Sequence, residues 1–123
     1  MPRISHFEFA AEKPERAQKF FEKAFGWKME KWENPGMEYW MITTGPKGEV
    51  GINGGMMKRS DAMSPTPFTI AVKDLDAQVR NVVAAGGKIT VQKSAIPGVG
   101  WFAKFADTEG NEFGLMQTDM AVK

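Results

Sequence analysis

The chain has no cysteine, almost no net charge and no long apolar run, and each absence excludes a class of function. Without thiols there is no disulfide, no thiolate nucleophile and no zinc–thiolate site. Sixteen basic and fifteen acidic residues nearly cancel, which argues against the clustered basic face of a nucleic-acid-binding protein. No stretch approaches the length of a membrane span, and the charged N-terminus lacks the apolar core of a signal peptide. We therefore expect a cytoplasmic protein whose partner is a small molecule, with no nucleic acid and no membrane.

Histidine is also scarce, because His6 is the one histidine in the chain. A nucleophilic triad lacks its parts when there is one histidine, no cysteine and no serine at a strand-to-helix elbow. Acyl transfer through a covalent intermediate is therefore excluded.

The sequence contains an internal repeat. Residues 35–52 and 97–115 both start with Pro-Gly, continue through an aromatic-rich run and a glycine-containing turn, and end in Glu-x-Gly. The repeat indicates two similar halves that pack against each other. The alignment pairs Pro35 with Pro97, Tyr39 with Trp101, Trp40 with Phe102, and, after a shift of one residue, Glu49 with Glu112 and Gly51 with Gly114.

Each half has the pattern strand, helix and three strands. Alternating apolar residues predict strands, and the spacing i, i+3, i+4, i+7 predicts helices, with Pro14 starting the first helix, Gly26 ending it and Asp74 capping the second. Residues 34–36 are predicted to form a turn, and the glycines and prolines of residues 54–67 to form a linker. The predicted strands are 3–10, 27–32, 38–44, 49–53, 68–72, 88–92, 101–106 and 112–117, and the predicted helices start at residues 14 and 75.

The predicted fold class is therefore α+β, with two repeated βαβββ modules forming a cupped mixed sheet. We expect a single domain over residues 1–123, with module 1 at about 1–55, the linker at about 56–67 and module 2 at about 68–123.

Alternation along each strand separates a face toward the helix from an inner face. The inner face is predicted to carry Phe102 and Lys104 in the second half and, by the repeat alignment, Trp40 and Ile42 in the first. This face either lines a cleft for a small molecule, or is an open sheet facing solvent, or is a dimer surface. The side chains predicted to face the helices are Phe7, Phe9, Val50, Ile52, Ile70, Val72, Trp101, Ala103, Phe105, Phe113 and Leu115.

Three motifs resemble the vicinal oxygen chelate superfamily, which contains glyoxalase I, extradiol dioxygenases and bleomycin resistance proteins. They are the opening Ile4-Ser5-His6-Phe7-Glu8, the helix Pro14-Glu15-Arg16-Ala17 with Phe20-Phe21 and Phe25-Gly26-Trp27 after it, and the turn Asp107-Thr108-Glu109-Gly110-Asn111-Glu112-Phe113. The last is similar to the family's Asp-Pro-x-Gly-Asn turn. The resemblance covers the whole chain and implies this fold, and it also implies a homodimer in which a second chain borders the cleft.

The resemblance also implies where a metal would bind, on the first and last strands of each module. Carried over by position, the four sites are His6, Gly51, Thr69 and Gly114. Of these, His6 alone is a good ligand for a divalent metal. Glu49 and Glu112 lie one strand step away from these positions. We therefore predict no metal and no other cofactor, with a metal possible only if His6 recruits other ligands.

The candidate site is centred on His6 and Glu8, which are two positions apart on one strand and so point the same way. They either transfer protons as a catalytic pair, or Glu8 holds a buried hydrogen-bond network or pairs with Lys104. Trp40 and Phe102 either flank a flat ligand or pack in the core. The predicted ligand-binding residues are His6, Glu8, Trp40, Thr69, Phe102 and Lys104, and the predicted catalytic residues are His6 and Glu8.

Two functions follow from these residues. The first is a protein like the bleomycin resistance proteins, with a degenerate metal site, that binds a small, mostly apolar or aromatic molecule in the cleft between the modules. The alternative is a glyoxalase-like lyase or isomerase that uses His6 and Glu8 for proton transfer. Whether the protein is an enzyme stays open, and so does a third interpretation, a purely structural dimeric partner.

Overall fold

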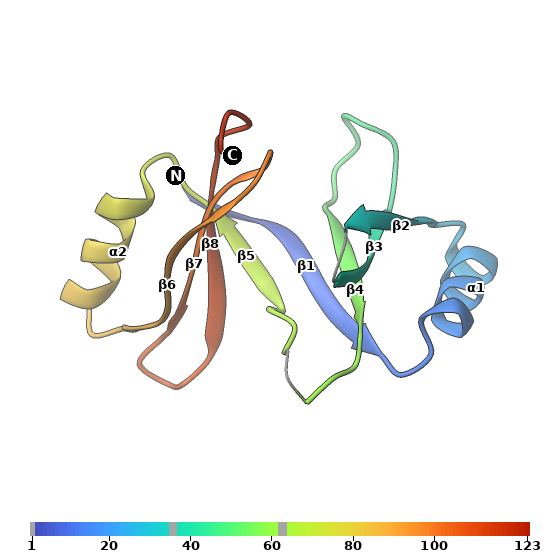
Figure 1. The fold of residues 1–123 in the computed structure, drawn as a ribbon, viewed down its shortest axis with the longest axis horizontal. Coiled ribbons are helices and arrows are strands. Elements are labelled where there is room, and N and C mark those ends of the chain that lie inside the picture. The colour runs from blue at the N-terminus through green and yellow to red at the C-terminus, as the bar shows by residue number, and fades with distance from the viewer. Residues whose placement is uncertain (1, 35–36, 62–63) are drawn as a thin grey trace. The chain divides into compact units, whose positions relative to one another are not determined.

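The computed structural model describes residues 2–34, 37–61 and 64–123 and shows eight strands and two helices in the described part. The turn predicted at Pro35-Gly36 lies outside the described residues. No helix of the described residues is long and apolar enough to cross a membrane. In chain order the elements are β1 (Arg3–Ala11), α1 (Pro14–Phe25), β2 (Lys28–Asn34), β3 (Met37–Thr43), β4 (Asn53–Lys58), β5 (Phe68–Ala71), α2 (Leu75–Ala84), β6 (Lys88–Ile96), β7 (Gly100–Ala106) and β8 (Glu112–Thr118), as labelled in Figure 1.

The chain divides into two compact units with the same internal arrangement. The N-terminal unit is His6–Thr66, and the C-terminal unit is Pro67–Lys123 together with the residues up to Ser5. Within the first, the strand order is β2-β3-β4-β1; within the second, it is β6-β7-β8-β5. In both, three strands are antiparallel and the last pair, β4–β1 or β8–β5, is parallel. The predicted α+β class with two repeated βαβββ modules is confirmed.

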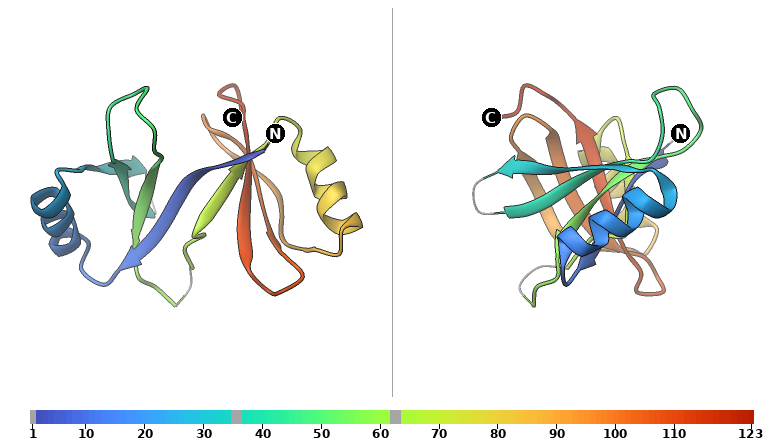
Figure 2. Two further views of the ribbon diagram at one scale, coloured as in Figure 1. Left: turned by 180° about the vertical axis from the view of Figure 1, so that it is seen from behind. Right: turned by 90° about the vertical axis from the view of Figure 1, so that its right-hand side faces the viewer.

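In the N-terminal unit, α1 lies beside the strands of its own sheet (Figure 2) and covers an aromatic core. Pro14 is the first residue of α1, and Gly26 ends it in the left-handed conformation, φ 72°, donating its N–H to Glu22. Proline at the first position and glycine after the last are the residues that helix ends favour. The core consists of Met29, Trp40, Ile42 and Met56, with Phe7, Phe9, Ala11, Ala17, Phe21 and Trp27 packed against it.

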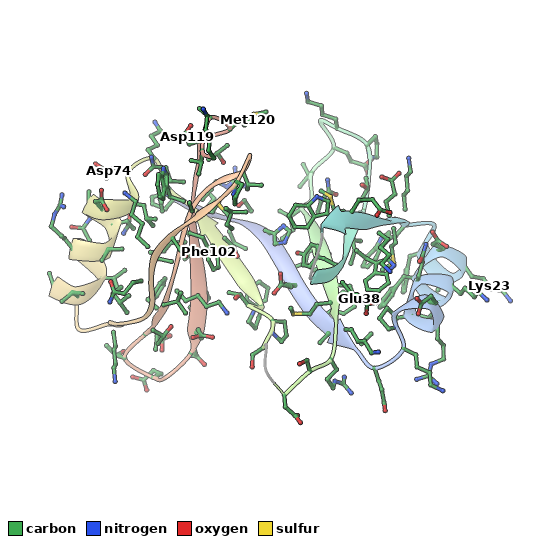
Figure 3. The ribbon with its side chains drawn as sticks, viewed as in Figure 1. Lys23, Glu38, Asp74, Phe102, Asp119 and Met120 are labelled. Atoms are coloured by element: carbon green, nitrogen blue, oxygen red, sulfur yellow. The ribbon has the colours of Figure 1, made fainter. Side chains whose placement is uncertain are left out.

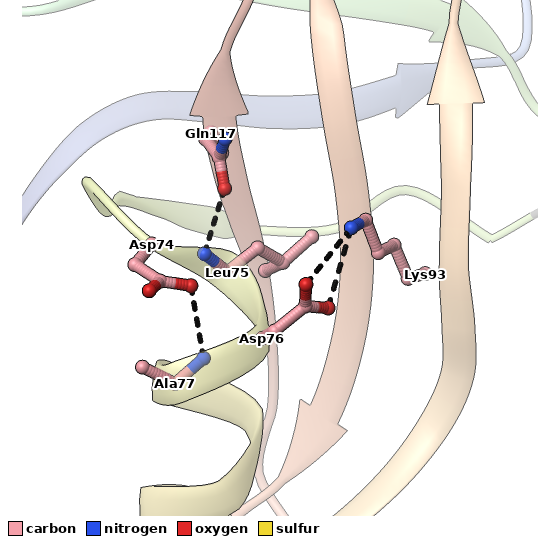
Figure 4. A network of polar contacts seen from close by, with 6 residues as sticks. All are labelled: Asp74, Leu75, Asp76, Ala77, Lys93 and Gln117. Atoms are coloured by element: carbon pink, nitrogen blue, oxygen red, sulfur yellow. Dashed lines mark hydrogen bonds and ion pairs between the residues drawn. The ribbon is translucent and has the colours of Figure 1, made fainter.

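In the C-terminal unit, the first turn of α2 is held by three polar contacts (Figure 4). The Asp74 carboxylate accepts the N–H of Ala77 at 3.1 Å, which confirms the predicted cap. Gln117 accepts the N–H of Leu75 at 2.8 Å, and Lys93 forms an ion pair with Asp76 at 3.1 Å. The bonds to Asp74 and Gln117 satisfy two of the N–H groups that a helix start leaves without partners. The core beneath α2 is Leu75, Ala103 and Leu115, with Ile70, Val72, Val79, Val82, Trp101 and Phe105 against it.

The strand predicted at residues 49–53 is wrong. Residues 44–52 form a loop in which Val50 is fully exposed, and β4 begins at Asn53. The loop is held by the Thr44 hydroxyl, which donates to the carbonyl of Ile52 at 2.6 Å. Residues 54–58, predicted as part of the linker, belong to β4, and Met56 and Met57 are buried. The error arose because the loop between β3 and β4 is longer than its counterpart at 107–111, which moves the fourth strand later in the chain.

This shift also changes the register of the repeat. Phe7 and Ile42 both pair with Gly54, as Ile70 and Ala103 both pair with Leu115, so Ile42 corresponds to Ala103. Trp40 therefore corresponds to Trp101, one residue away from the predicted partner Phe102. A slip of one residue exchanges the two faces of a strand.

The inner-face positions predicted for Trp40 and Ile42 are therefore wrong, because both side chains lie in the core on the helix side, at 2% and 1% exposure. A lysine lies over each corresponding tryptophan ring, Lys31 over Trp40 at 5.4 Å and Lys93 over Trp101 at 4.8 Å. The recurrence of this contact supports the corrected alignment.

Candidate functional site

The candidate site lies on the face of the N-terminal sheet that points away from α1. Paired residues of neighbouring strands share a face, and β1 pairs with β4 through His6–Asn53 and Glu8–Gly55. On the other side of β4, Met41 pairs with Gly55 and Tyr39 with Met57, and Trp32 pairs with Tyr39. The corrected face therefore carries His6, Glu8, Trp32, Tyr39, Met41 and Met57.

Three side chains on this face form one hydrogen-bond chain, which we call the His6–Tyr39–Glu8 chain. The Tyr39 hydroxyl donates to Oε2 of Glu8 at 3.0 Å and lies 3.0 Å from Nε2 of His6. The other carboxylate oxygen of Glu8, Oε1, accepts the backbone N–H of Thr66 at 2.9 Å. All three bonds are partly buried. Of the alternatives open from the sequence, Glu8 does hold a hydrogen-bond network; its pairing with Lys104 stays a prediction.

The two glycines of β4 make room for this arrangement. A Cβ at position 55 would overlap the Tyr39 hydroxyl, and a Cβ at position 54 would overlap the backbone and ring of Phe7. Because neighbouring strand residues point to opposite faces, Gly55 admits Tyr39 on one side and Gly54 admits Phe7 on the other. Glycine inside a strand often marks such a close approach.

Burial and the Glu8 charge set the protonation of the chain. Burial raises the pKa of Tyr39 well above its usual value, and the charge of Glu8 and its hydrogen bond raise it further. Burial lowers the pKa of His6, and the charge of Glu8 offsets part of that decrease. At neutral pH the phenol therefore keeps its proton and the imidazole is neutral.

In the C-terminal unit, Thr69, Phe102 and Lys104 share the face opposite α2, as predicted. Thr69 and Lys104 both pair with Gly114, and Phe102 (labelled in Figure 3) pairs with Met116. A Cβ on Gly114 would lie 2.8 Å from both the Phe102 ring and the Thr69 hydroxyl, so this glycine leaves room for the two side chains. Thr69 is buried at 5% exposure, and Phe102 and Lys104 are partly buried.

The polar chain is not repeated in this unit. In the corrected alignment, Thr69 stands where the first unit has His6, Ala71 where it has Glu8, and Gly100 where it has Tyr39. The two units therefore share a fold and differ in chemistry.

Of the residues at the positions that the family resemblance implies for a metal, His6 alone is a good ligand for a divalent ion. Gly51, the position carried over from the predicted fourth strand, lies in the loop 44–52. Asn53 takes its place, because Asn53 pairs with His6 as Gly114 pairs with Thr69. The Asn53 oxygen already accepts the N–H of Thr44 at 2.9 Å, Gly114 has no side chain, and Nε2 of His6 bonds to Tyr39. Within residues 2–34, 37–61 and 64–123, no three histidine or acidic side chains come together. A threonine hydroxyl and an amide oxygen are poor ligands beside imidazole and carboxylate.

A hollow of about 460 Å³ lies elsewhere, beside the start of α1. Its charged lining has both signs, and none of the candidate residues borders it. The lining residues are Glu12, Lys13, Pro14, Glu15, Arg16, Lys19, Glu38 and Lys58.

Comparison with known proteins agrees with this fold. The family model described as Glyoxalase/Bleomycin resistance protein/Dioxygenase superfamily matches residues 3–115, and the chain belongs to this superfamily.

Among its relatives, a glyoxylase-like domain-containing protein of Didymella fabae is 35% identical over 118 residues, covering 91% of each chain. A putative glyoxylase, CFP32, of Mycobacterium bovis is 29% identical over 112 residues, covering 89% of this chain and 42% of its own length.

Solved structures share the fold at low sequence identity. Methylmalonyl-CoA epimerase from Mycobacterium tuberculosis has a TM-score of 0.71 at 13% identity, covering 94% of this chain and 87% of the epimerase. A methylmalonyl-CoA epimerase in complex with methylmalonyl-CoA and NH4+ also has a TM-score of 0.71 at 13% identity, covering 100% and 99% of the two chains. At these identities the likeness concerns the fold alone.

Proposed function

We propose that the chain binds a small, mostly apolar or aromatic molecule on the face of the N-terminal sheet that points away from α1, without a divalent metal. The His6–Tyr39–Glu8 chain carries this proposal, because it places a partly buried polar group among apolar side chains. Small-molecule sites combine apolar walls with a few oriented polar groups in this way.

The apolar wall consists of Trp32 and Met41 in place of the predicted Trp40. The Trp32 ring packs edge-on against Tyr39 with 6.1 Å between ring centroids, and Met41 is 55% exposed. A flat ring and a flexible thioether together suit aromatic ligands of varied shape. Thr69, Phe102 and Lys104 stay proposed ligand contacts on the face of their own sheet.

A second candidate, a lyase or isomerase that uses His6 and Glu8 for proton transfer, is favoured by one observation. The imidazole of His6 is neutral and linked to a carboxylate through Tyr39, and a neutral imidazole can accept a proton from a substrate. The names of the relatives, glyoxylase-like protein and putative glyoxylase, are consistent with such a reaction. We also propose a homodimer, which the family resemblance implies.

A thermal-shift screen of small aromatic compounds tests the binding proposal, using the wild type, His6→Ala and the control Lys23→Ala. Lys23 is an exposed residue of α1, on the other side of the sheet. Supporting compounds stabilise the wild type and the Lys23 variant and lose most of this effect in His6→Ala. A compound that stabilises all three proteins equally binds away from His6 and contradicts the proposal.

Elemental analysis of the purified protein tests the absence of a metal. A stoichiometric divalent metal would contradict it.

For the enzymatic candidate, each stabilising compound is incubated in D2O with the wild type and His6→Ala. Deuterium incorporated at carbon by the wild type alone would favour the lyase or isomerase over the binding protein.

A further inference from the structure

We propose that Tyr39 is a positioning residue that holds His6 as the tautomer protonated at Nε2, so that the site presents the Nδ1 lone pair and selects ligands with an O–H or N–H donor. This inference rests on the proposed binding of a ligand at His6. Tyr39 is the only tyrosine of the chain.

The direction of the hydrogen bonds follows from counting protons. The backbone N–H of Thr66 can only donate, and a carboxylate can only accept. Glu8 therefore accepts from Thr66 at Oε1 and from the Tyr39 hydroxyl at Oε2. The single proton of Tyr39 is used in the second bond, so the phenol oxygen has only lone pairs left for His6.

The bond between Tyr39 and His6 must then be donated by the imidazole. Nε2 of His6 lies 3.0 Å from the phenol oxygen, and an unprotonated Nε2 would place two lone pairs against each other. If Tyr39 donated to His6 instead, Oε2 of Glu8 would face the lone pairs of the phenol oxygen with no proton between the two oxygens. Hydrogen bonds to charged acceptors are roughly twice as strong as neutral ones, which favours the direction toward Glu8.

Nδ1 of His6 is the atom that remains for a ligand. In the part of the chain that the structure describes, the imidazole forms its hydrogen bond through Nε2, and every fully buried polar side-chain atom has a partner. Nδ1 is therefore accessible as an acceptor. Because Trp32 and Met41 share this face, the matching ligand is an aromatic donor such as a phenol.

Because His6 is the only histidine, nitrogen NMR of the imidazole reports on this site alone. In the wild type at neutral pH, two-bond proton–nitrogen correlations should assign the ring proton to Nε2. A proton on Nδ1 would overturn the proposal.

The variant Glu8→Gln gives a sharper result, because it should reverse the chain. The Thr66 N–H keeps the amide oxygen turned toward it, so the amide NH2 faces Tyr39. The Tyr39 hydroxyl must then donate to Nε2 of His6, and the ring proton moves to Nδ1. The control Glu33→Gln changes an exposed carboxylate of β2 and should leave the tautomer unchanged.

Tyr39→Phe removes the hydroxyl and should give a mixture of tautomers, which serves as a second test if Glu8→Gln does not fold. A tautomer that is the same in the wild type and in each folded variant at Glu8 or Tyr39 would refute the role of Tyr39. A merely structural role would change stability and leave the tautomer as it is.

Ligand selection is tested by comparing phenol with anisole, its methyl ether. The wild type should bind phenol about fivefold or more tightly, because one hydrogen bond is lost with the ether. Equal affinity would refute the selection. If neither compound perturbs the His6 signals, the proposed binding of small aromatic molecules at His6 fails, while the tautomer measurements still decide the role of Tyr39.

Discussion

Replacing Gly55 by alanine should remove Tyr39 from its position and disrupt the site. The new methyl group would occupy the space of the Tyr39 hydroxyl, which has no second place beside both His6 and Glu8. Overpacking a well-packed position costs about 1–3 kcal/mol, and each lost hydrogen bond adds about 1 kcal/mol. Together these terms cost about 3–5 kcal/mol, because Tyr39 loses two hydrogen bonds, and the preference of a strand for alanine over glycine offsets about 0.5–1 kcal/mol of that cost. We therefore expect Gly55→Ala to lower the free energy of unfolding by about 2–4 kcal/mol.

The assay is urea unfolding followed by circular dichroism, run as a double-mutant cycle with Tyr39→Ala. In the Tyr39→Ala background the methyl group meets no phenol, and alanine is favoured over glycine in a strand by about 0.5–1 kcal/mol. Gly55→Ala should then be slightly stabilising, so the coupling energy is about 3–5 kcal/mol. Gly45→Ala is the control, since a Cβ there meets only the end of the Glu49 side chain at 3.7 Å. Equal costs of Gly55→Ala in the two backgrounds would refute this account of the strand.

Three further predictions concern stability. Because the pKa of His6 is lowered in the folded chain, the unfolded chain takes up the proton first as the pH falls. The contribution of His6 to the free energy of unfolding is therefore complete above pH 6.5 and is lost as the pH falls through the lowered pKa; His6→Asn should remove this part of the pH dependence in urea titrations. Trp40→Ala should cost about 3–5 kcal/mol and Trp32→Ala distinctly less, since Trp40 is 2% exposed and Trp32, on the face away from α1, is only partly buried; equal urea midpoints would contradict the corrected register. Asp74→Ala should cost about 1 kcal/mol through loss of the α2 cap, and Asp76→Ala, which loses an exposed ion pair, about 0–1 kcal/mol; thermal unfolding compares the two.

The sequence was sufficient for the fold class and for most elements, because these depend on local patterns. The stripe ending at Phe25-Gly26 and the cap at Asp74 act within a few residues, and both are confirmed. The repeat then implied that the second half has the architecture of the first. His6 and Glu8 could be placed on one face from their spacing alone.

Register could not be predicted in the same way, because it depends on loop length and on pairing between distant residues. The motif Glu49-x-Gly51 resembles Glu112-x-Gly114, yet the first lies in a loop and the second in β8. The resulting slip of one residue placed Trp40 on the wrong face, and Tyr39 was therefore not predicted as a residue of the site. One signal was present: Gly54-Gly55 followed by two methionines is consistent with a strand approached closely from both sides.

The lysines that lie over Trp40 and Trp101 have a consequence for how the molecule meets its neighbours. Lys31 belongs to β2 and Lys93 to β6, the outer strands of the two sheets. A charged side chain on an outer strand hinders a foreign strand from adding to the exposed backbone, since pairing would bury the ammonium group. Both borders are protected against sheet extension by the same device, so we expect the proposed homodimer to form through a different surface.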